Sequence, residues 1–221
     1  MARAASVHIG LNHVDPNKYD GWPGALRFAE MSAQQMHEIA TACQYNARSM
    51  LSAEAATLGN VQSSIHRLAS TLTGGDLFVV TFSGHGTQSQ SASGTTVEKW
   101  CLFDGELTDI ALVSLLNTIA ANVRVLVISE SCHGGGMLEP AIGKALREPY
   151  LFLSACAKGE EVPERAFTDS LLDVWQKGSF GGNYERFHEE IDARMPTHQA
   201  ILQHNNGPSS RQFIEQHPFS K

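Results

Sequence analysis

Two apolar runs, at residues 76–82 and 123–128, constrain the fold of this chain more than any other sequence feature. Both are rich in β-branched residues, and each has the length of an ordinary strand. A strand that is apolar on both faces must be buried on both faces, which is the position of a central strand in a parallel sheet covered by helices. The two runs therefore predict a parallel sheet as the core of the protein.

Helical patterns alternate with strand-like runs along the chain, which is typical of an α/β domain with a largely parallel sheet. No repeat, low-complexity tract or linker divides the sequence, so we expect a single domain over residues 1–221. The polar residues 83–99 and the glycine-rich residues 131–148 are expected to be loops. We predict strands at 6–11, 47–51, 76–82, 123–128, 149–155 and 198–203, and helices at about 25–43, 61–72, 108–119, 168–177 and 184–193, with Thr108 and Asn183 as caps.

The composition excludes several classes of protein. The 221 residues carry 16 Lys and Arg against 23 Asp and Glu, a net charge of −7. Contacts to phosphates need a basic surface, so we expect no nucleic-acid partner. The sequence has no apolar segment long enough to span a bilayer, and its N-terminus lacks a basic flank followed by an apolar core. We therefore expect no membrane association and a cytoplasmic location.

The four cysteines include no C-x-x-C pair, so neither a metal site nor a dithiol site is expected. Cys43, Cys101 and Cys156 continue apolar patterns, and we predict that they are small core residues. Cys132 fits no such pattern, because it stands in a polar and glycine-rich segment directly after the second apolar run.

Potential catalytic groups follow both central strands. His85 lies in Phe-Ser-Gly-His-Gly after the first run, and Cys132 lies in Ser-Glu-Ser-Cys-His-Gly-Gly after the second. The carboxyl ends of neighbouring parallel strands open onto one crevice, so we expect His85 and Cys132 to face the same crevice. An imidazole beside a thiol raises the thiolate fraction and so creates a nucleophile. The backbone N–H groups of Gly86 and Cys132 are candidate donors to an oxyanion.

Other readings of these residues stay open. His133 is a rival base, although adjacent residues of an extended strand end point their side chains apart. Taken alone, the Cys132 motif is also compatible with a cysteine that is merely buried, and the His85 motif with a histidine that is merely hydrogen-bonded. The glycines at 134–136 are expected to leave room for a substrate backbone.

Together the two motifs resemble those of caspase-like cysteine peptidases of the metacaspase and orthocaspase branch, in its small bacterial form. Residues 82–86 are similar to the family's Tyr/Phe-Ser-Gly-His-Gly, and residues 130–135 resemble its Asp-Ser-Cys-His-Ser-Gly. The separation of His85 and Cys132 is also similar to the roughly 50 residues found in caspase-type proteases. The resemblance implies a three-layer sandwich in which a mostly parallel sheet of about six strands lies between helices. It further implies peptide hydrolysis without a cofactor, with His85 as general base and Cys132 as nucleophile.

The substrate pocket departs from the family pattern. In the metacaspase branch, acidic groups hold a basic side chain before the scissile bond, and the corresponding positions here are Glu130 and Ser32. Because Ser32 has no carboxylate, this chain lacks one of the two acidic groups of the family's pocket. The resemblance still favours cleavage after Arg or Lys, and a structural carboxylate is the alternative role for Glu130. Val97 and Ile110 stand where relatives carry acidic residues, which weakens the calcium-binding role that the resemblance suggests.

We expect a protein or peptide substrate, and control by self-cleavage, an activating partner or a small signalling molecule. Lys144 and Arg147 are candidate self-cleavage sites, with ordinary exposed charges as the alternative. Two rival functions remain: a catalytically silent caspase-like binding module, and a Cys-dependent hydrolase of small amides. A dinucleotide-binding enzyme is disfavoured, since no G-x-G-x-x-G follows the first strand. The oligomeric state is not predicted.

Overall fold

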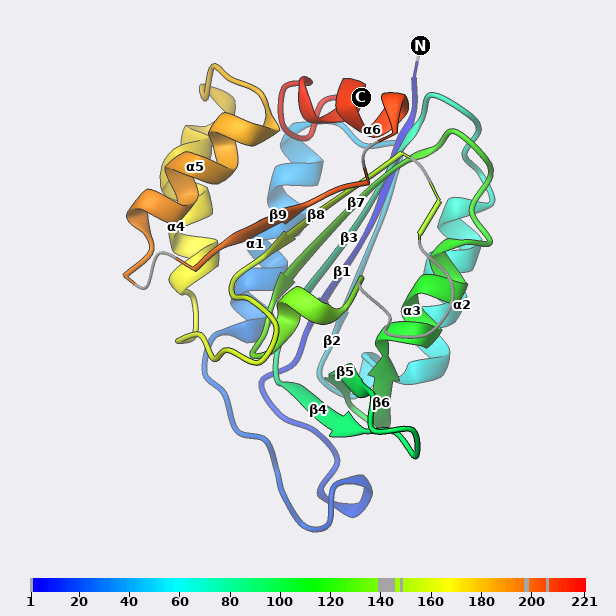
Figure 1. The fold of residues 1–221 in the computed structure, drawn as a ribbon, viewed down its shortest axis with the longest axis vertical. Coiled ribbons are helices and arrows are strands. Elements are labelled where there is room, and N and C mark those ends of the chain that lie inside the picture. The colour runs from blue at the N-terminus through cyan, green and yellow to red at the C-terminus, as the bar shows by residue number, and fades with distance from the viewer. Residues whose placement is uncertain (1, 139–145, 148, 197–198, 206) are drawn as a thin grey trace.

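The computed structural model describes residues 2–138, 146–147, 149–196, 199–205 and 207–221. Its core is a six-stranded sheet in the order β2-β1-β3-β7-β8-β9 (Figure 1). The first five strands in that order are parallel, and β9 is antiparallel to β8. The predicted, mostly parallel sheet of six strands is therefore confirmed. The strands are β1 (Ala4–Gly10), β2 (Ala47–Ser52), β3 (Leu77–Ser83), β7 (Arg124–Glu130), β8 (Tyr150–Ser154) and β9 (Ile201–Gln203).

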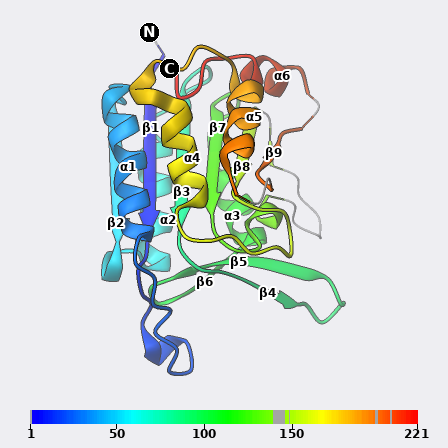
Figure 2. The ribbon, with the colours of Figure 1, turned by 90° about the vertical axis from the view of Figure 1, so that its left-hand side faces the viewer.

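Helices cover both faces of this sheet and complete a three-layer sandwich, as predicted (Figure 2). One face carries α1 (Ala29–Ala42), α4 (Ala166–Trp175) and α5 (Tyr184–Arg194), and the other carries α2 (Leu58–Ala69) and α3 (Asp109–Leu116). After β9 comes α6 (Pro208–Ile214), whose 7 residues are too few to show a helical period in the sequence. Short 3-10 helices lie at Pro16–Lys18, Ala53–Ala55, Gly134–Gly136 and Gln176–Gly178.

Strand β3 shows why the apolar runs become central strands. Phe78, Val80 and Phe82 pack into the apolar cluster beneath α2 and α3, whereas Leu77 and Val79 pack into the cluster beneath α1, α4 and α5. Every residue of β3 and of β7 is buried. Each strand thus contributes side chains to both apolar layers, which is the environment that an uninterrupted apolar run requires.

The predicted caps are confirmed, because the side chains of Thr108 and Asn183 accept hydrogen bonds from the first turns of α3 and α5. The predicted start of the first helix is wrong by about one turn, since α1 begins at Ala29. The backbone N–H groups at 27–28 donate instead to the carboxylate of Glu164. That side chain comes from a distant loop, so local periodicity cannot reveal it.

The polar residues 83–99 are not all loop, contrary to the prediction. A second, antiparallel sheet is formed by β4 (Gly86–Gln90), β5 (Thr96–Leu102) and β6 (Gly105–Thr108), in that order. Strand β4 is polar and largely exposed, so its sequence shows no alternation of apolar residues. Trp100 of β5 joins this sheet to the core, because its ring stacks on Phe82 with centroids 4.6 Å apart and its Nε1–H donates to Ser129 Oγ over 3.0 Å.

All four cysteines are free. Cys101 and Cys156 are buried, as predicted, whereas Cys43 is only partly buried because it lies at the C-terminal end of α1. Among the described helices, none combines the length and the apolar character that a membrane span requires.

Candidate active site

The pairing of β3 with β7 places the His85 and Cys132 motifs side by side. The strands are parallel and pair from Leu77 with Arg124 to Ser83 with Glu130, a constant offset of 47 residues. His85 and Cys132 each lie two residues beyond the last pair, and so they have the same offset. The pairing continues past the strand ends, since the Gly84 N–H donates to the Glu130 carbonyl over 3.2 Å. The spacing of the two motifs in the sequence is therefore the register of the central sheet.

Gly86 and Cys132 are in direct backbone contact. A Cβ atom placed on Gly86 would lie 1.9 Å from the carbonyl oxygen of Cys132 and 3.2 Å from Cβ of Ser131. Only glycine allows this approach without displacement of one of the two segments. The His85 carbonyl accepts a hydrogen bond from the Cys101 N–H over 2.9 Å, so β5 fixes the backbone of His85 from the other side.

His85 and Cys132 line one pocket of about 200 Å³ at the carboxyl ends of the central strands. Its walls come from four segments: the stretch that enters α1, the two strand ends, and the loop between β8 and α4. The lining residues are Leu26, Ala29, Ser83, Gly84, His85, Glu130, Ser131, Cys132, Val162, Pro163, Glu164 and Arg165.

The His85 ring is half-buried and lies against Trp22, with ring centroids 4.7 Å apart. Burial lowers the pKa of His85 below its usual value, while a backbone hydrogen bond with Gly24 and the negative charge of Glu164 act in the opposite direction. Its Nε2 atom is buried and has no hydrogen-bond partner among the described residues. The ring is therefore held in place, and its lowered pKa favours the neutral imidazole, which is the form that accepts a proton.

Cys132 is half-buried, and its thiol lies 4.0 Å from the carbonyl oxygen of Val162. No described residue accepts a hydrogen bond from the Cys132 backbone N–H. The rival base, His133, has a positive φ of 58°, and its N–H donates to the Glu160 carbonyl over 2.6 Å. His133 does not line the pocket that holds Cys132, so the geometry favours His85 as the partner of the thiol.

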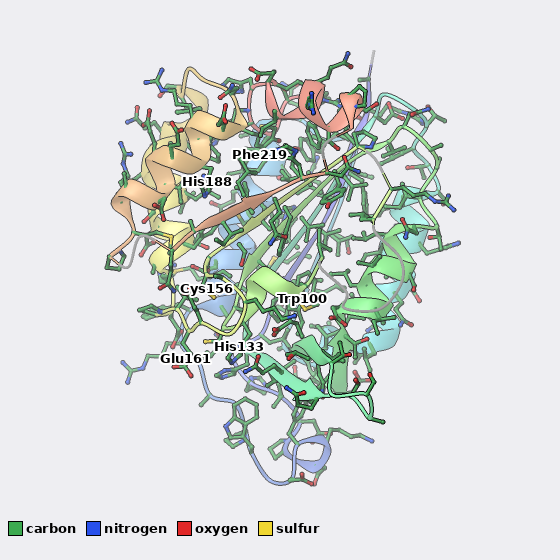
Figure 3. The ribbon with its side chains drawn as sticks, viewed as in Figure 1. Trp100, His133, Cys156, Glu161, His188 and Phe219 are labelled. Carbon is green, nitrogen blue, oxygen red and sulfur yellow. The ribbon has the colours of Figure 1, made fainter. Side chains whose placement is uncertain are left out.

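The glycines at 134–136 do not leave room for a substrate, contrary to the prediction. A Cβ on Gly135 would lie 2.7 Å from the Cys156 carbonyl oxygen, and one on Gly136 would lie 2.3 Å from Cγ of Glu98. These residues form a buried 3-10 turn that packs against the chain itself. Figure 3 shows His133, Cys156 and Trp100 together at this end of the sheet. The glycines therefore permit close packing behind Cys132.

Glu130 lines the pocket but is only 6% exposed, and donors from its own chain engage both of its oxygens. The N–H of Thr168 donates to Oε1 over 2.8 Å, and the hydroxyls of Thr168 and Ser83 donate to Oε2 over 2.6 and 3.1 Å. Since Thr168 stands in the first turn of α4, this carboxylate ties that helix to the end of β7. Glu130 thus has a structural role in addition to its position in the pocket.

Ser32, which the resemblance suggests as a substrate-binding residue, is not among the residues that line the pocket. It lies on the sheet-facing side of α1, is 1% exposed, and its hydroxyl has no partner among the described residues. Of the two candidate cleavage sites, Arg147 is exposed, and Lys144 lies outside the described residues.

Sequence reasoning missed the contributions of Trp22, Glu164 and Arg165 to the site. They come from two loops that precede helices and belong to no periodic pattern. The only local signal is the spacing of Arg165 and Asp169, which form an i,i+4 ion pair at the start of α4. The contact of Glu164 with the segment before α1 spans 137 residues, so only the folded chain reveals it.

Two further carboxylates are buried behind the 3-10 turn. Glu98 and Asp109 are both 0% exposed, and neither Glu98 oxygen has a partner among the described residues. Burial raises the pKa of Glu98 to about 7 and also raises that of Asp109, while the charge of Lys158 opposes both shifts. Within the described ranges no three His, Cys, Asp or Glu side chains come together as a metal-binding group.

Comparisons with known proteins identify the family and the fold that the chain resembles. A family model described as "Caspase domain" matches residues 14–217. Metacaspase-4 of Arabidopsis thaliana is 28% identical over 88 residues, which cover 37% of this chain and only about a fifth (21%) of that protein. Protein GSU0716 of Geobacter sulfurreducens superposes with a TM-score of 0.85 at 32% identity, over 99% of this chain and 98% of that one. Caspase-1 of Spodoptera frugiperda gives 0.63 at 11% identity, over 97% and 83%, which is a likeness of fold alone.

Proposed function

The chain belongs to the caspase domain family of peptidases, and we propose that it is a cysteine endopeptidase with Cys132 as nucleophile and His85 as general base and acid. The observation that carries the proposal is the shared register of β3 and β7, which sets His85 and Cys132 at equivalent positions beyond the two strands and in one pocket. Their presence in one pocket, on adjacent strand ends, supports their assignment as the nucleophile and base that this kind of catalysis requires.

The reaction follows from the properties of the two groups. His85 takes the thiol proton, and Cys132 Sγ bonds to the scissile carbonyl carbon as the carbonyl electron pair moves onto oxygen. The backbone N–H groups of Gly86 and Cys132 stabilise that oxyanion. The His85 imidazolium gives its proton to the leaving amine, and the C–N bond breaks. Water, deprotonated by His85, then attacks the thioester, and the released thiolate regains the ion pair with the imidazolium.

The surroundings of His85 suit this cycle. Burial against Trp22 lowers the pKa of the ring, so the neutral base predominates before the thiol proton is taken. The hydrogen bond with Gly24 and the charge of Glu164 favour the imidazolium that forms next. Neither protonation state is therefore strongly disfavoured, which is the condition for a group that must serve as base and then as acid.

For specificity we propose cleavage after Arg or Lys. The pocket beside Cys132 carries the carboxylates of Glu130 and Glu164. Among the described residues that line it, Arg165 is the one Lys or Arg, and its guanidinium is already paired with Asp169. Leu26, Ala29, Val162 and Pro163 add apolar wall, which suits the aliphatic part of a long basic side chain. We also propose that self-cleavage at Lys144 or Arg147, or an activating partner or small molecule, controls the enzyme.

Cleavage-site profiling on a denatured proteome tests the proposal. Wild-type protein should generate new peptide N-termini after Arg or Lys, and Cys132→Ala should generate none. Cys43→Ala is the matched control, because Cys43 is also a partly buried free cysteine but lies at the far end of α1, outside the pocket. If the Cys132→Ala pattern equals that of wild type, the proposed nucleophile is wrong. A loss of intact mass in wild type but not in Cys132→Ala would report self-cleavage.

A further inference from the structure

We propose that Glu164, in the loop between β8 and α4, is the residue that selects a positively charged side chain at the position before the scissile bond. This inference rests on the proposed peptidase function and deepens it. Glu164 lines the same pocket as His85 and Cys132, and it is close enough to His85 for its charge to raise the pKa of that ring.

Of the two carboxylates that line the pocket, that of Glu164 is the more accessible to a substrate. Glu130 is 6% exposed and already accepts three hydrogen bonds from Thr168 and Ser83. Glu164 is exposed, and the described residues donate to Oε2 only: the N–H groups of Arg27 and Phe28, over 2.8 and 2.9 Å. Its Oε1 therefore faces no donor of its own chain within the described ranges. No described cation forms an ion pair with either glutamate.

Arg165 does not reverse this charge. Its Nε and Nη2 atoms both donate to the Asp169 carboxylate, and its guanidinium lies 5.8 Å from the centroid of the Phe28 ring. The remaining nitrogen, Nη1, is buried from solvent and has no partner among the described residues. An acidic substrate side chain would thus find no accessible cation on this residue, whereas the negative charge of Glu164 stays uncompensated.

The backbone holds Glu164 in position. Two N–H groups before α1 fix one of its oxygens, so the carboxylate bridges the two loops on either side of the pocket. The next residue, Arg165, adopts a positive φ of 66°, a conformation that non-glycine residues rarely take and that is often found at functional sites. Leu26, Val162 and Pro163 supply apolar walls beside the carboxylate. The geometry suits a long side chain with an aliphatic stem and a cationic end.

The test compares two fluorogenic peptides that differ only before the scissile bond, one with arginine and one with citrulline, its neutral isostere. The measured quantity is the ratio of kcat/KM for arginine to that for citrulline, in which changes common to both substrates cancel. In Glu164→Gln, the amide oxygen still accepts from the backbone but the charge is lost. We expect the ratio to fall roughly tenfold, mainly through a higher KM for arginine. Glu164→Lys, which reverses the charge, should lower the ratio further and provides a second, independent variant.

Glu161→Gln is the matched control, because Glu161, labelled in Figure 3, is an exposed glutamate of the same loop. Since Glu161 does not line the pocket, this variant should leave the ratio unchanged. If Glu164→Gln keeps the wild-type ratio, or if wild type does not distinguish arginine from citrulline, the inference is overturned while the peptidase function stands. If wild type cleaves neither peptide, nor any protein, in a Cys132-dependent manner, the proposed function itself fails.

Discussion

The substitution Gly86→Ala is expected to separate the two halves of the active site. An alanine Cβ would lie 1.9 Å from the carbonyl oxygen of Cys132, and Cβ atoms essentially never approach heavy atoms within 3.0 Å. The backbone of Gly86 or of Cys132 must therefore move by roughly 1 Å. A misplacement of this size in a catalytic arrangement costs on the order of 100-fold in rate. The clash itself should destabilise the fold by about 1–3 kcal/mol, as overpacking generally does.

The assay measures kcat/KM for an arginine-ended peptide together with the free energy of unfolding in urea. Gly59→Ala is the matched control: Gly59 lies in α2, and no heavy atom stands within 4 Å of its added Cβ. That variant should keep full activity and gain up to about 1 kcal/mol of stability from helix propensity. If folded Gly86→Ala retained an activity close to that of wild type, the backbone contact would not be what positions the nucleophile.

Three further perturbations have defined outcomes. Thr168→Val removes the hydroxyl that donates to Glu130 over 2.6 Å, and it should destabilise the protein by about 1.5–3 kcal/mol in urea denaturation; an unchanged midpoint would contradict the structural role of that carboxylate. Trp22→Ala exposes His85 to water, so the His85 pKa that burial lowers should rise. The acidic limb of the pH profile of kcat/KM should then move to higher pH, and a shift to lower pH would refute burial as the cause of the lowered pKa. Glu98 has a pKa raised to about 7, so the folded protein binds the proton more tightly and stability should fall as pH rises from about 4.5 through 7. Glu98→Gln should flatten this slope in urea unfolding at pH 5 and 8, and an equally steep slope in the variant would assign it to other groups.

The sequence was sufficient to predict the central architecture because burial on both faces leaves an unambiguous pattern. The runs at 76–82 and 123–128 became β3 and β7, and their register accounts for the spacing of His85 and Cys132. Strand β4 escaped prediction because it is exposed and held by backbone pairing, which imposes no apolar alternation.

The substrate pocket was harder to predict than the strand-end motifs, because its walls come from loops that meet only in the folded chain. Glu164 reaches the segment before α1 across 137 residues, and nothing in its neighbours indicates that contact. Ser32 corresponds to a substrate-binding position by resemblance, and the structure places it on the buried, sheet-facing side of α1, outside the lining of the pocket. Sequence motifs can locate catalytic candidates that the register of a sheet brings together. The positions of side chains on loops become apparent only in the folded structure.

The pairing of His85 with Cys132 is tested most directly by the rate at which each cysteine reacts with iodoacetamide, followed by mass spectrometry across pH. We expect Cys132 to react much faster than the partly buried Cys43 near neutral pH, and we expect His85→Ala to abolish this advantage while leaving the rate of Cys43 unchanged. If Cys132 reacts no faster than Cys43, or if its rate is the same in His85→Ala, the imidazole does not activate the thiol and the proposed mechanism is contradicted.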